Sequence, residues 1–323
     1  MRVGVDVMGG DFAPEATLKG ALLARKIMSD SDVIFLIGDQ VVIRDFFKKE
    51  NAVETGFEIV HTSEIIEMGD SPIKAFNKKP NSSISIGFKL LKEKKIDSFA
   101  SAGNSGAMLV GSVYSVNTIP GVIRPTTSGI IPQESGGVSV LLDIGTNPDI
   151  RPDVMHQFGI IGSLYAQHVL NIKTPKVALL NIGEEEEKGN LLCQAAFNLM
   201  KDSEEINFIG NIESRDLFKS KADVIVCDGF TGNIVLKLIE AMYRLIAKRD
   251  MVDDYFNRFN YENYGGSPVL GINDTVLLGH GISNPTAIMN MILESKAVHE
   301  AKLPQKIKRS FKQFSQKQVD KSI

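Results

Sequence analysis

Short runs of apolar residues alternate with longer stretches of helical periodicity along most of the chain. Residues 3–7 have the pattern of a buried strand, and residues 14–28 that of a helix with proline in its first turn. The alternation predicts a parallel sheet whose strands are joined by helices. It continues through strand-like runs at 33–37, 57–60 and 98–102 and helix-like runs at 39–49, 82–95 and 105–117.

The middle of the chain departs from this alternation. Two strand-like runs, 126–131 and 138–142, are separated by a segment with Pro132, Gly136 and Gly137 that is too short for a crossover helix. They predict an antiparallel hairpin. The alternation then resumes over 154–170, 177–181, 189–201, 206–210, 224–228 and 234–248.

No segment has the composition of a linker, and no internal repeat is evident. We therefore expect a single α/β catalytic domain over residues 1–300, with a loop or helical excursion near 245–267. Residues 301–323 are expected to form a basic amphipathic C-terminal helix or tail. Its apolar face carries Leu303, Ile307, Phe311 and Phe314, with lysine and arginine around them.

Composition narrows the functional classes. Of 323 residues, 36 are Lys or Arg and 39 are Asp or Glu, and this net charge of -3 argues against a protein that coats nucleic acid. The two cysteines lack zinc or disulfide spacing, and the five histidines lack zincin spacing, so we expect no metal site. Without a signal region or a membrane-length apolar run, a cytoplasmic protein is expected, with at most peripheral binding at the inner face of the membrane.

Glycine-rich loops that follow predicted strands are the first candidates for a binding site, because ligands of open parallel sheets bind at the carboxyl ends of the strands. Their glycines and the N–H groups of the helix that follows could hold a phosphate. Ordinary turns with side-chain caps, such as Asp11, explain these loops about as well. The candidates are Asp6, Gly9, Gly10 and Asp11 in the first loop, Asn104 and Ser105 in the second, and Gly229, Phe230, Thr231 and Asn233 in the third.

Other polar residues also follow predicted strands. Asp143 and Asn147 end one strand, and Asn181 precedes four glutamates, 184–187, which we expect in the first turn of a helix, where they would stabilise its dipole. Glu185 could meet substrate, and Lys188 could be the cation at this rim, although most lysines are simply solvated. His280 lies between two glycines, where it could act as acid, base or donor or could stabilise the turn.

The chain lacks the dinucleotide, P-loop, nucleophile-elbow and kinase signatures. The residues by themselves therefore indicate an α/β enzyme that acts on something phosphorylated. Read in order, however, its loops closely resemble those of the phosphate acyltransferase family called PlsX. The matching segments are residues 5–11, 103–107, 121–125, 181–183, 188–190, 228–233, 264–266 and 279–281.

This resemblance implies an enzyme that moves a long acyl chain from acyl carrier protein to inorganic phosphate. The acyl phosphate would serve a glycerol-phosphate acyltransferase in phospholipid synthesis. The resemblance also implies a homodimer without a cofactor. The implied fold has three layers, α/β/α, around a mixed, mostly parallel sheet, and is similar to isopropylmalate dehydrogenases and phosphotransacetylases.

Phosphate is already an anion and can attack a thioester itself, so this chemistry requires positioning and oxyanion stabilisation rather than a protein nucleophile. We hypothesise that N–H groups around Gly9, Gly10, Gly229 and Thr231 hold phosphate and the oxyanion. Lys188 would offset charge, and His280 would protonate the leaving thiolate. Asn104, Ser105 and Asn233 would add side-chain donors, and Asp6, Asp11, Asp143, Asn147, Asn181, Glu185, Phe230, Gly265 and Gly266 complete the predicted site.

Alternatives remain at this point. One is a phosphotransacetylase-like enzyme that uses short acyl-CoA, and another is a non-catalytic scaffold that binds carrier protein. Members of the resembled family carry a longer amphipathic insertion before the segment at 264–266, linked to membrane contact, whereas 239–264 is short here. The basic tail could replace that insertion if Phe311 and Phe314 enter the bilayer, or it could pack against the body of the protein.

Overall fold

The computed structural model describes residues 1–320, with side chains for residues 1–314, so the last three residues of the predicted tail lie outside the described residues. The chain forms two compact units. Unit 1 contains Met1–Thr118 and Tyr261–Glu300, and unit 2 contains Ile119–Asn260 and the segment from Ala301. The sequence predicts a single domain over 1–300; in the structure this stretch contributes to two units, each with its own group of strands.

The strands of unit 1 follow the order β3-β2-β1-β4-β11-β10. All neighbours are parallel except β10 and β11, which are antiparallel. Val5 lies opposite Leu36 on one side and Ala100 on the other. The predicted mostly parallel arrangement is therefore confirmed here. The strands are β1 (Arg2–Asp6), β2 (Val33–Gly38), β3 (Phe57–His61), β4 (Ser98–Ser101), β10 (Gly266–Leu270) and β11 (Thr275–Gly279).

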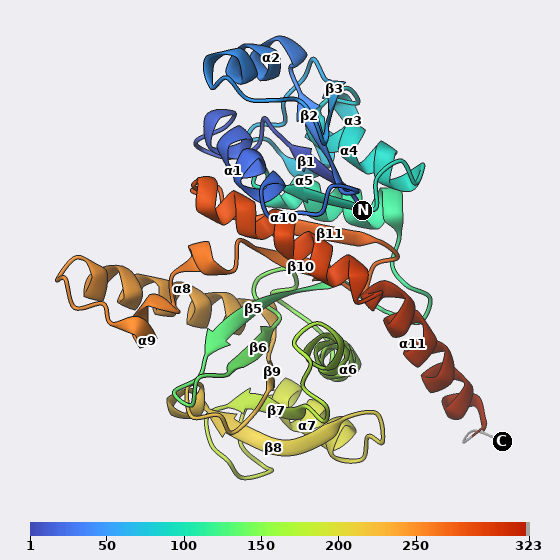
Figure 1. Ribbon diagram of the computed structural model, residues 1–323. Helices are drawn as coiled ribbons and strands as arrows, with labels where there is room; N and C mark the ends of the chain where they lie inside the picture. Colours follow the sequence, from blue (N-terminus) through green and yellow to red (C-terminus); the bar gives the residue numbers. More distant parts are fainter. Residues whose placement is uncertain (321–323) are drawn as a thin grey trace. The chain divides into compact units, whose positions relative to one another are not determined.

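Strand alternation gives unit 1 a hydrophobic core on each face of its strands. In β2, Ile34 and Leu36 pack into one core, whereas Phe35 and Ile37 pack into the other. The first core is covered by α1 (Glu15–Arg25), α2 (Gln40–Lys49) and α10 (Pro285–Glu300). The second is covered by α3 (Pro72–Lys78), which sequence analysis missed, α4 (Ser83–Lys92), α5 (Ser105–Gly111) and η1 (Ser112–Val116), as Figure 1 shows.

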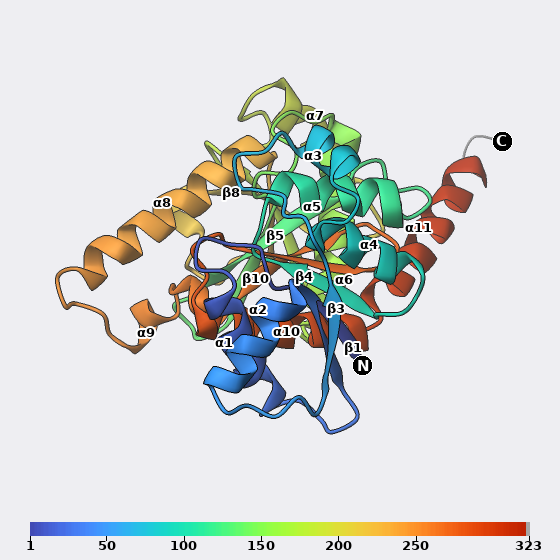
Figure 2. The same ribbon diagram turned by 90° about the horizontal axis from the view of Figure 1, so that it is seen from above.

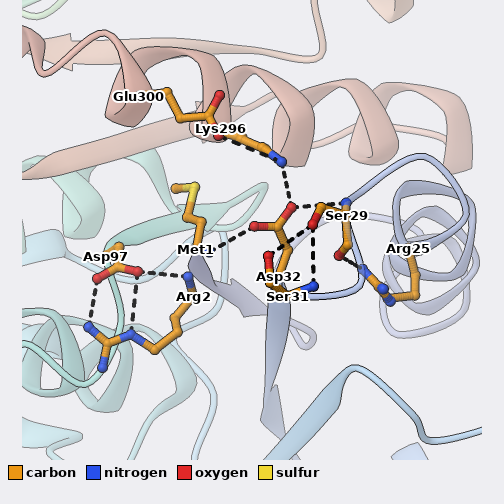
Figure 3. Close-up of polar contacts among 9 residues, drawn as sticks. All are labelled: Met1, Arg2, Arg25, Ser29, Ser31, Asp32, Asp97, Lys296 and Glu300. Atoms are coloured by element: carbon orange, nitrogen blue, oxygen red, sulfur yellow. Dashed lines mark hydrogen bonds and ion pairs between the residues drawn. The ribbon is translucent and has the colours of Figure 1, made fainter.

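A buried ion cluster ties the beginning of unit 1 to its last helix (Figure 3). The Asp32 carboxylate accepts hydrogen bonds from the amino group of Met1, at 2.7 Å, and from Nζ of Lys296 on α10. The Asp32 side chain is only 4% exposed. Burial would raise the pKa of Asp32, but the bonds from Lys296 and the amino group outweigh it and lower the pKa from 3.8 to about 2.

The strands of unit 2 follow the order β5-β6-β9-β7-β8. β5 and β6 form the predicted antiparallel hairpin, and the other neighbours are parallel. Helix α6 lies close to the strands because Gly162 has no side chain; a Cβ there would approach Leu142 to 2.6 Å. The elements are β5 (Thr126–Pro132), β6 (Val138–Leu142), β7 (Lys176–Asn181), β8 (Asn207–Glu213) and β9 (Val224–Val226), with α6 (Pro152–His168) and α7 (Leu191–Lys201) on one face and α8 (Gly229–Ala247) on the other.

Helix α8 is long, and most of it extends beyond the strands of unit 2 (Figure 2). Its only buried residues are Gly229 and Gly232 in the first turn. The excursion expected near 245–267 contains the short helices α9 (Asp254–Asn257) and η3 (Tyr261–Asn263). Large apolar side chains at helical spacing are exposed along α8, namely Phe230, Ile234, Leu238, Met242 and Leu245.

The predicted C-terminal helix is present as α11 (Leu303–Asp320). Its apolar face packs against α6, with Leu303, Ile307 and Phe311 buried and the Phe314 ring 5.7 Å from that of His156. Of the two alternatives for this helix, packing against the body of the protein is therefore the one that the structure shows, and the Phe311 and Phe314 rings belong to the packing of unit 2. Over residues 1–320, no helix is long and apolar enough to cross a membrane.

Candidate active site

Three loops of unit 1 meet at the carboxyl ends of β1, β4 and β11. Gly9 approaches Gly103 so closely that a Cβ at Gly9 would lie 2.7 Å from the Gly103 nitrogen. The N–H of Asp11 donates to the Gly281 carbonyl at 2.7 Å. The first two glycine loops of the predicted site therefore lie together, and glycine is required at the contact.

Asp6 organises the first of these loops from beneath. Its side chain is 1% exposed, and it accepts hydrogen bonds from the Ser101 hydroxyl at 2.7 Å and the Met8 N–H at 3.0 Å, as well as from the Gly9 N–H. Burial raises the pKa of Asp6, against the opposing effect of hydrogen bonds from Ser83 and Ser101. The Gly9 amide that was expected to hold phosphate is thus directed to the protein's own carboxylate.

Asn104 is the N-cap of α5, and its side chain also tethers a neighbouring loop. Its Oδ1 accepts from the Ala107 N–H at 2.9 Å. Its Nδ2 donates to the carbonyls of Glu67, Met68 and Asp70 at 3.0–3.2 Å. Both N–H bonds of the amide therefore have acceptors within unit 1, which suits a supporting residue better than the oxyanion donor that the sequence suggested.

His280 and Ser105 present their side chains near the surface of unit 1. Ser105 and Asp11 are exposed, and His280 is half-buried with its ring edge-on to Tyr261 at 5.2 Å. Gly265 and Gly266 do not line this group of loops. A Cβ at Gly265 would lie 2.1 Å from the Met291 nitrogen, so this glycine, at φ +72°, allows the chain to pass close to α10. The structure thus gives Gly265 and Gly266 a role in close backbone packing and not in the predicted phosphate contact.

In unit 2, Asp143 is a buried carboxylate that organises its own loop, as Asp6 does in unit 1. It is 0% exposed and accepts from the N–H groups of Gly145, Thr146 and Asn147 and from Asn147 Nδ2, at 2.6–3.0 Å. Burial raises the pKa of Asp143, against the opposing effect of these hydrogen bonds. Asp143 and Asn147 were expected to touch substrate, and the structure instead places them beneath the loop that they hold.

The third glycine loop packs directly on this one. The Gly229 N–H donates to the Asn147 carbonyl at 2.8 Å, and the Thr231 N–H donates to Asp228, the N-cap of α8, at 2.9 Å. The two N–H groups predicted to bind an anion are therefore occupied, because nearby acceptors compete for them. Asn233 is exposed just after the first turn of α8, beside Gly145, and Phe230 is 63% exposed.

The loop after β7 contains the predicted cation. Asn181 donates to the Lys188 carbonyl and to Asn211 Oδ1, both at 3.1 Å, and Asn211 donates to the Glu185 carbonyl. Lys188 is exposed, with its stem and the Glu185 carboxylate beside Gly183. The glutamates were expected in the first turn of a helix, and this is wrong: α7 begins at Leu191 with Asn190 as its N-cap, so residues 184–187 precede the helix.

A cavity of about 630 Å³ lies at the carboxyl ends of β7, β8 and β9 in unit 2. Two predicted residues, Asn181 and Thr231, line it. The others were not among the predicted site residues, although four of them, Ile182, Gly189, Asn190 and Asp228, lie in segments that match the resembled family. Ser214 also follows a strand, and Cys193 lies three residues after a helix cap. These other lining residues are Met155, Leu180, Ile182, Gly189, Asn190, Cys193, Glu213, Ser214, Cys227, Asp228 and Val235. Among residues 1–320, no cluster of three or more His, Cys, Asp or Glu side chains could hold a metal ion.

The fold is shared with a phosphotransacetylase and a phosphotransacylase of known structure. A phosphotransacetylase from Streptococcus pyogenes aligns with a TM-score of 0.63 at 16% identity, covering 92% of this chain and 94% of that one. A branched-chain phosphotransacylase from Enterococcus faecalis aligns with a TM-score of 0.62 at 14% identity, covering 93% and 99%. At such identities the likeness defines the fold, and it confirms the predicted α/β class with a mixed, mostly parallel sheet.

The sequence relatives are more specific. The model of the family described as "Fatty acid synthesis protein" matches residues 1–306, and the chain belongs to this family. The "Phosphate acyltransferase" of Halothermothrix orenii is 41% identical over 318 residues, covering 92% of this chain and 94% of the relative. That of Acetivibrio thermocellus is 39% identical over the whole of both chains. The predicted membership among phosphate acyltransferases, a class of transferases, is confirmed.

Proposed function

We propose that this chain transfers a long-chain acyl group from acyl carrier protein to inorganic phosphate, giving acyl phosphate and free carrier protein for phospholipid synthesis. The observation that carries the proposal is the 41% identity to a phosphate acyltransferase over nearly the full chain. The family description, which refers to fatty acid synthesis, supports an acyl donor from that process. Phosphate supplies the nucleophile, so the reaction needs no serine or cysteine triad.

The proposed reaction is one displacement at the thioester carbonyl. An oxygen of HPO4²⁻ bonds to the carbonyl carbon, a tetrahedral oxyanion forms, and the carbon–sulfur bond then breaks. The proton of the phosphate ends on sulfur, so the products are acyl phosphate and the free thiol. Donors placed where the oxyanion develops lower the barrier, and a positive charge stabilises the approaching phosphate.

We assign these tasks to side chains that the loops leave exposed or half-buried. In unit 2, Asn233 supplies an oxyanion donor and Lys188 supplies positive charge. Asp6, Asn104 and Asp143 are positioning residues, because their polar atoms hold the loops.

The activity is tested by incubating the protein with palmitoyl-acyl carrier protein and radiolabelled orthophosphate, and by separating labelled palmitoyl phosphate from free phosphate. We expect labelled palmitoyl phosphate with the protein present, and release of the carrier thiol that requires added phosphate. A parallel incubation with acetyl-CoA tests the short-chain alternative. Phosphate-dependent product from acetyl-CoA alone would assign the donor to that class, and carrier binding without any product would indicate a scaffold.

Replacing Asn233 by alanine should lower kcat by more than about tenfold, because removing an oxyanion donor commonly costs that much or more. Steady-state kinetics with palmitoyl-acyl carrier protein measures the loss. Asn207→Ala is the matched control, since Asn207 is exposed at the opposite, amino end of β8. Equal kcat values for the two folded variants would remove Asn233 from the mechanism.

We further propose that a second copy of this chain covers the exposed apolar face of α8. Exposed apolar patches of this kind commonly mark contact surfaces. Leu238, which is 62% exposed at the middle of that face, is the residue to change. Leu238→Asp should shift the molar mass measured by light scattering from dimer to monomer. Leu199→Asp, on the exposed side of α7, should not, and a wild-type monomer would contradict the proposal.

A further inference from the structure

We propose that the cavity of unit 2 is the pocket for the hydrocarbon chain of the acyl donor. This inference rests on the proposed function and adds to it the place where the donor's apolar part binds. The cavity lies entirely among residues of one unit, at the carboxyl ends of three parallel strands. Ligands of α/β sheets bind at this end of the strands.

The lining of the cavity has a buried apolar part and an exposed part. Met155, Leu180 and Cys227 form the buried part, at 0%, 8% and 2% exposed. Ile182 is 81% exposed, and Asn190 and Ser214 are exposed as well, at the mouth. A ligand with an apolar end and a polar end would therefore enter with its apolar end first.

Several polar groups of the lining are already bonded to the protein. Asn181 donates to the Lys188 carbonyl and to Asn211, and its Oδ1 accepts from the Ile182 N–H. Thr231 donates both its N–H and its hydroxyl to Asp228. Because these groups are satisfied by the loops, they offer a ligand little polar recognition, whereas the apolar surface of the lining remains available for binding.

The charges of the lining residues argue against phosphate as the ligand of the cavity. Of the described residues that line the cavity, none is Lys, Arg or His, whereas two, Glu213 and Asp228, are acidic. Arg215 pairs with Glu213 and is not one of the residues that line the cavity. An anion would meet like charges there, but a neutral hydrocarbon would not.

The size of the cavity suits a chain rather than a short acyl group. Its volume of about 630 Å³ is within the range of pockets that bury most of a drug-sized ligand. Each methylene that enters should improve binding about fourfold, since burial of one such group contributes that factor. Preference for acyl donors should therefore rise with chain length until the pocket is full.

Cys193 provides a test that does not depend on catalysis. It lines the cavity and is partly exposed, whereas Cys227 is buried. Burial raises the pKa of the Cys193 thiol, so alkylation by N-ethylmaleimide is followed at mildly alkaline pH. Dodecanol at ten times its Kd should slow the alkylation about tenfold, and orthophosphate should not slow it. Cys193→Ser identifies the labelled thiol. Protection by orthophosphate or pantetheine, without protection by dodecanol, would overturn the proposal.

A second test uses Val235, which lines the cavity from α8. The larger side chain of Val235→Trp fills part of the cavity, so at least two methylenes of a palmitoyl chain can no longer be buried there. The ratio of kcat/KM for palmitoyl donors to kcat/KM for decanoyl donors should therefore fall about tenfold or more. The KM for phosphate should stay unchanged. Leu199→Trp, on the exposed side of α7, is the control. An unchanged dependence of kcat/KM on chain length in folded Val235→Trp would refute the assignment of the cavity to the acyl chain.

Failure of the wild-type enzyme to form acyl phosphate would instead refute the proposed function, and the alkylation result would still stand.

Discussion

Replacing Asp143 by alanine is expected to lower the free energy of unfolding by about 3–5 kcal/mol. The carboxylate is fully buried and accepts from three backbone N–H groups and from the Asn147 side chain. Alanine would leave these donors without an acceptor, and each buried unsatisfied donor costs about 1–3 kcal/mol. Those at Gly145 and Thr146 lie nearer the surface, where water can replace part of the loss. Urea unfolding at neutral pH measures the change.

Two companion variants separate the loss of these bonds from other effects. Asp143→Asn keeps one acceptor oxygen and should lose less stability than the alanine variant. Asp149→Ala removes an exposed carboxylate from the same loop and should change stability by less than about 0.5 kcal/mol. If Asp143→Ala is no less stable than Asp149→Ala, the buried carboxylate does not organise the loop.

Asp32→Asn is expected to destabilise the protein by about 3 kcal/mol at neutral pH. The substitution leaves the amino group of Met1 and the ammonium of Lys296 beside a neutral amide in a site that is largely shielded from water. Removing one partner of a buried ion pair typically lowers the free energy of unfolding by about 3–5 kcal/mol. Because Lys296 is partly exposed, we expect a value at the lower end of this range. The midpoint of urea unfolding should fall accordingly, whereas Asp30→Asn, at an exposed neighbour, should leave it nearly unchanged.

The same carboxylate gives the stability a predictable pH dependence. The pKa of Asp32 is about 2 in the folded protein and 3.8 in its ordinary state, so folding favours the charged form. The contribution of this carboxylate to the free energy of unfolding is fully present above about pH 5. It is lost as pH falls through 3.8 toward 2, and the loss amounts to about 2 kcal/mol in total. Stability curves of wild type and Asp32→Asn should therefore converge on the acid side. Parallel curves would contradict the assigned pKa.

The sequence was sufficient to predict much of the local structure. The hairpin of β5 and β6 follows from two strand-like runs that are too close together for a helix, and the packing of Leu303, Ile307 and Phe311 follows from their shared face. Asn104 caps the helix that follows its strand, as an ordinary turn predicts, whereas Asp11 does not cap α1, whose N-cap is Pro14. These features depend on neighbours in the chain, which the sequence displays directly.

Features that depend on distant or competing partners could not be predicted. Glycine loops before helices suggested free N–H groups, but Asp6, Asp143 and Asp228 turn back and accept them. Nothing in the pattern distinguishes a carboxylate that binds its own loop from one that faces a ligand. The cavity was missed for the same reason, because Met155 and Cys227 have the pattern of ordinary core residues and meet only after β7, β8 and β9 are assembled.

The division of unit 1 between Met1–Thr118 and Tyr261–Glu300 has a consequence for biosynthesis. β4 pairs with β11, and α1 packs against α10, so the first 118 residues leave the ribosome long before the partners that cover them. At roughly 5–20 residues per second, the nascent chain waits for about 10 seconds or more with this apolar surface open. Ribosome-associated chaperones can bind this apolar surface during that interval. A translation pause before residue 261 would lengthen the time for which they stay bound.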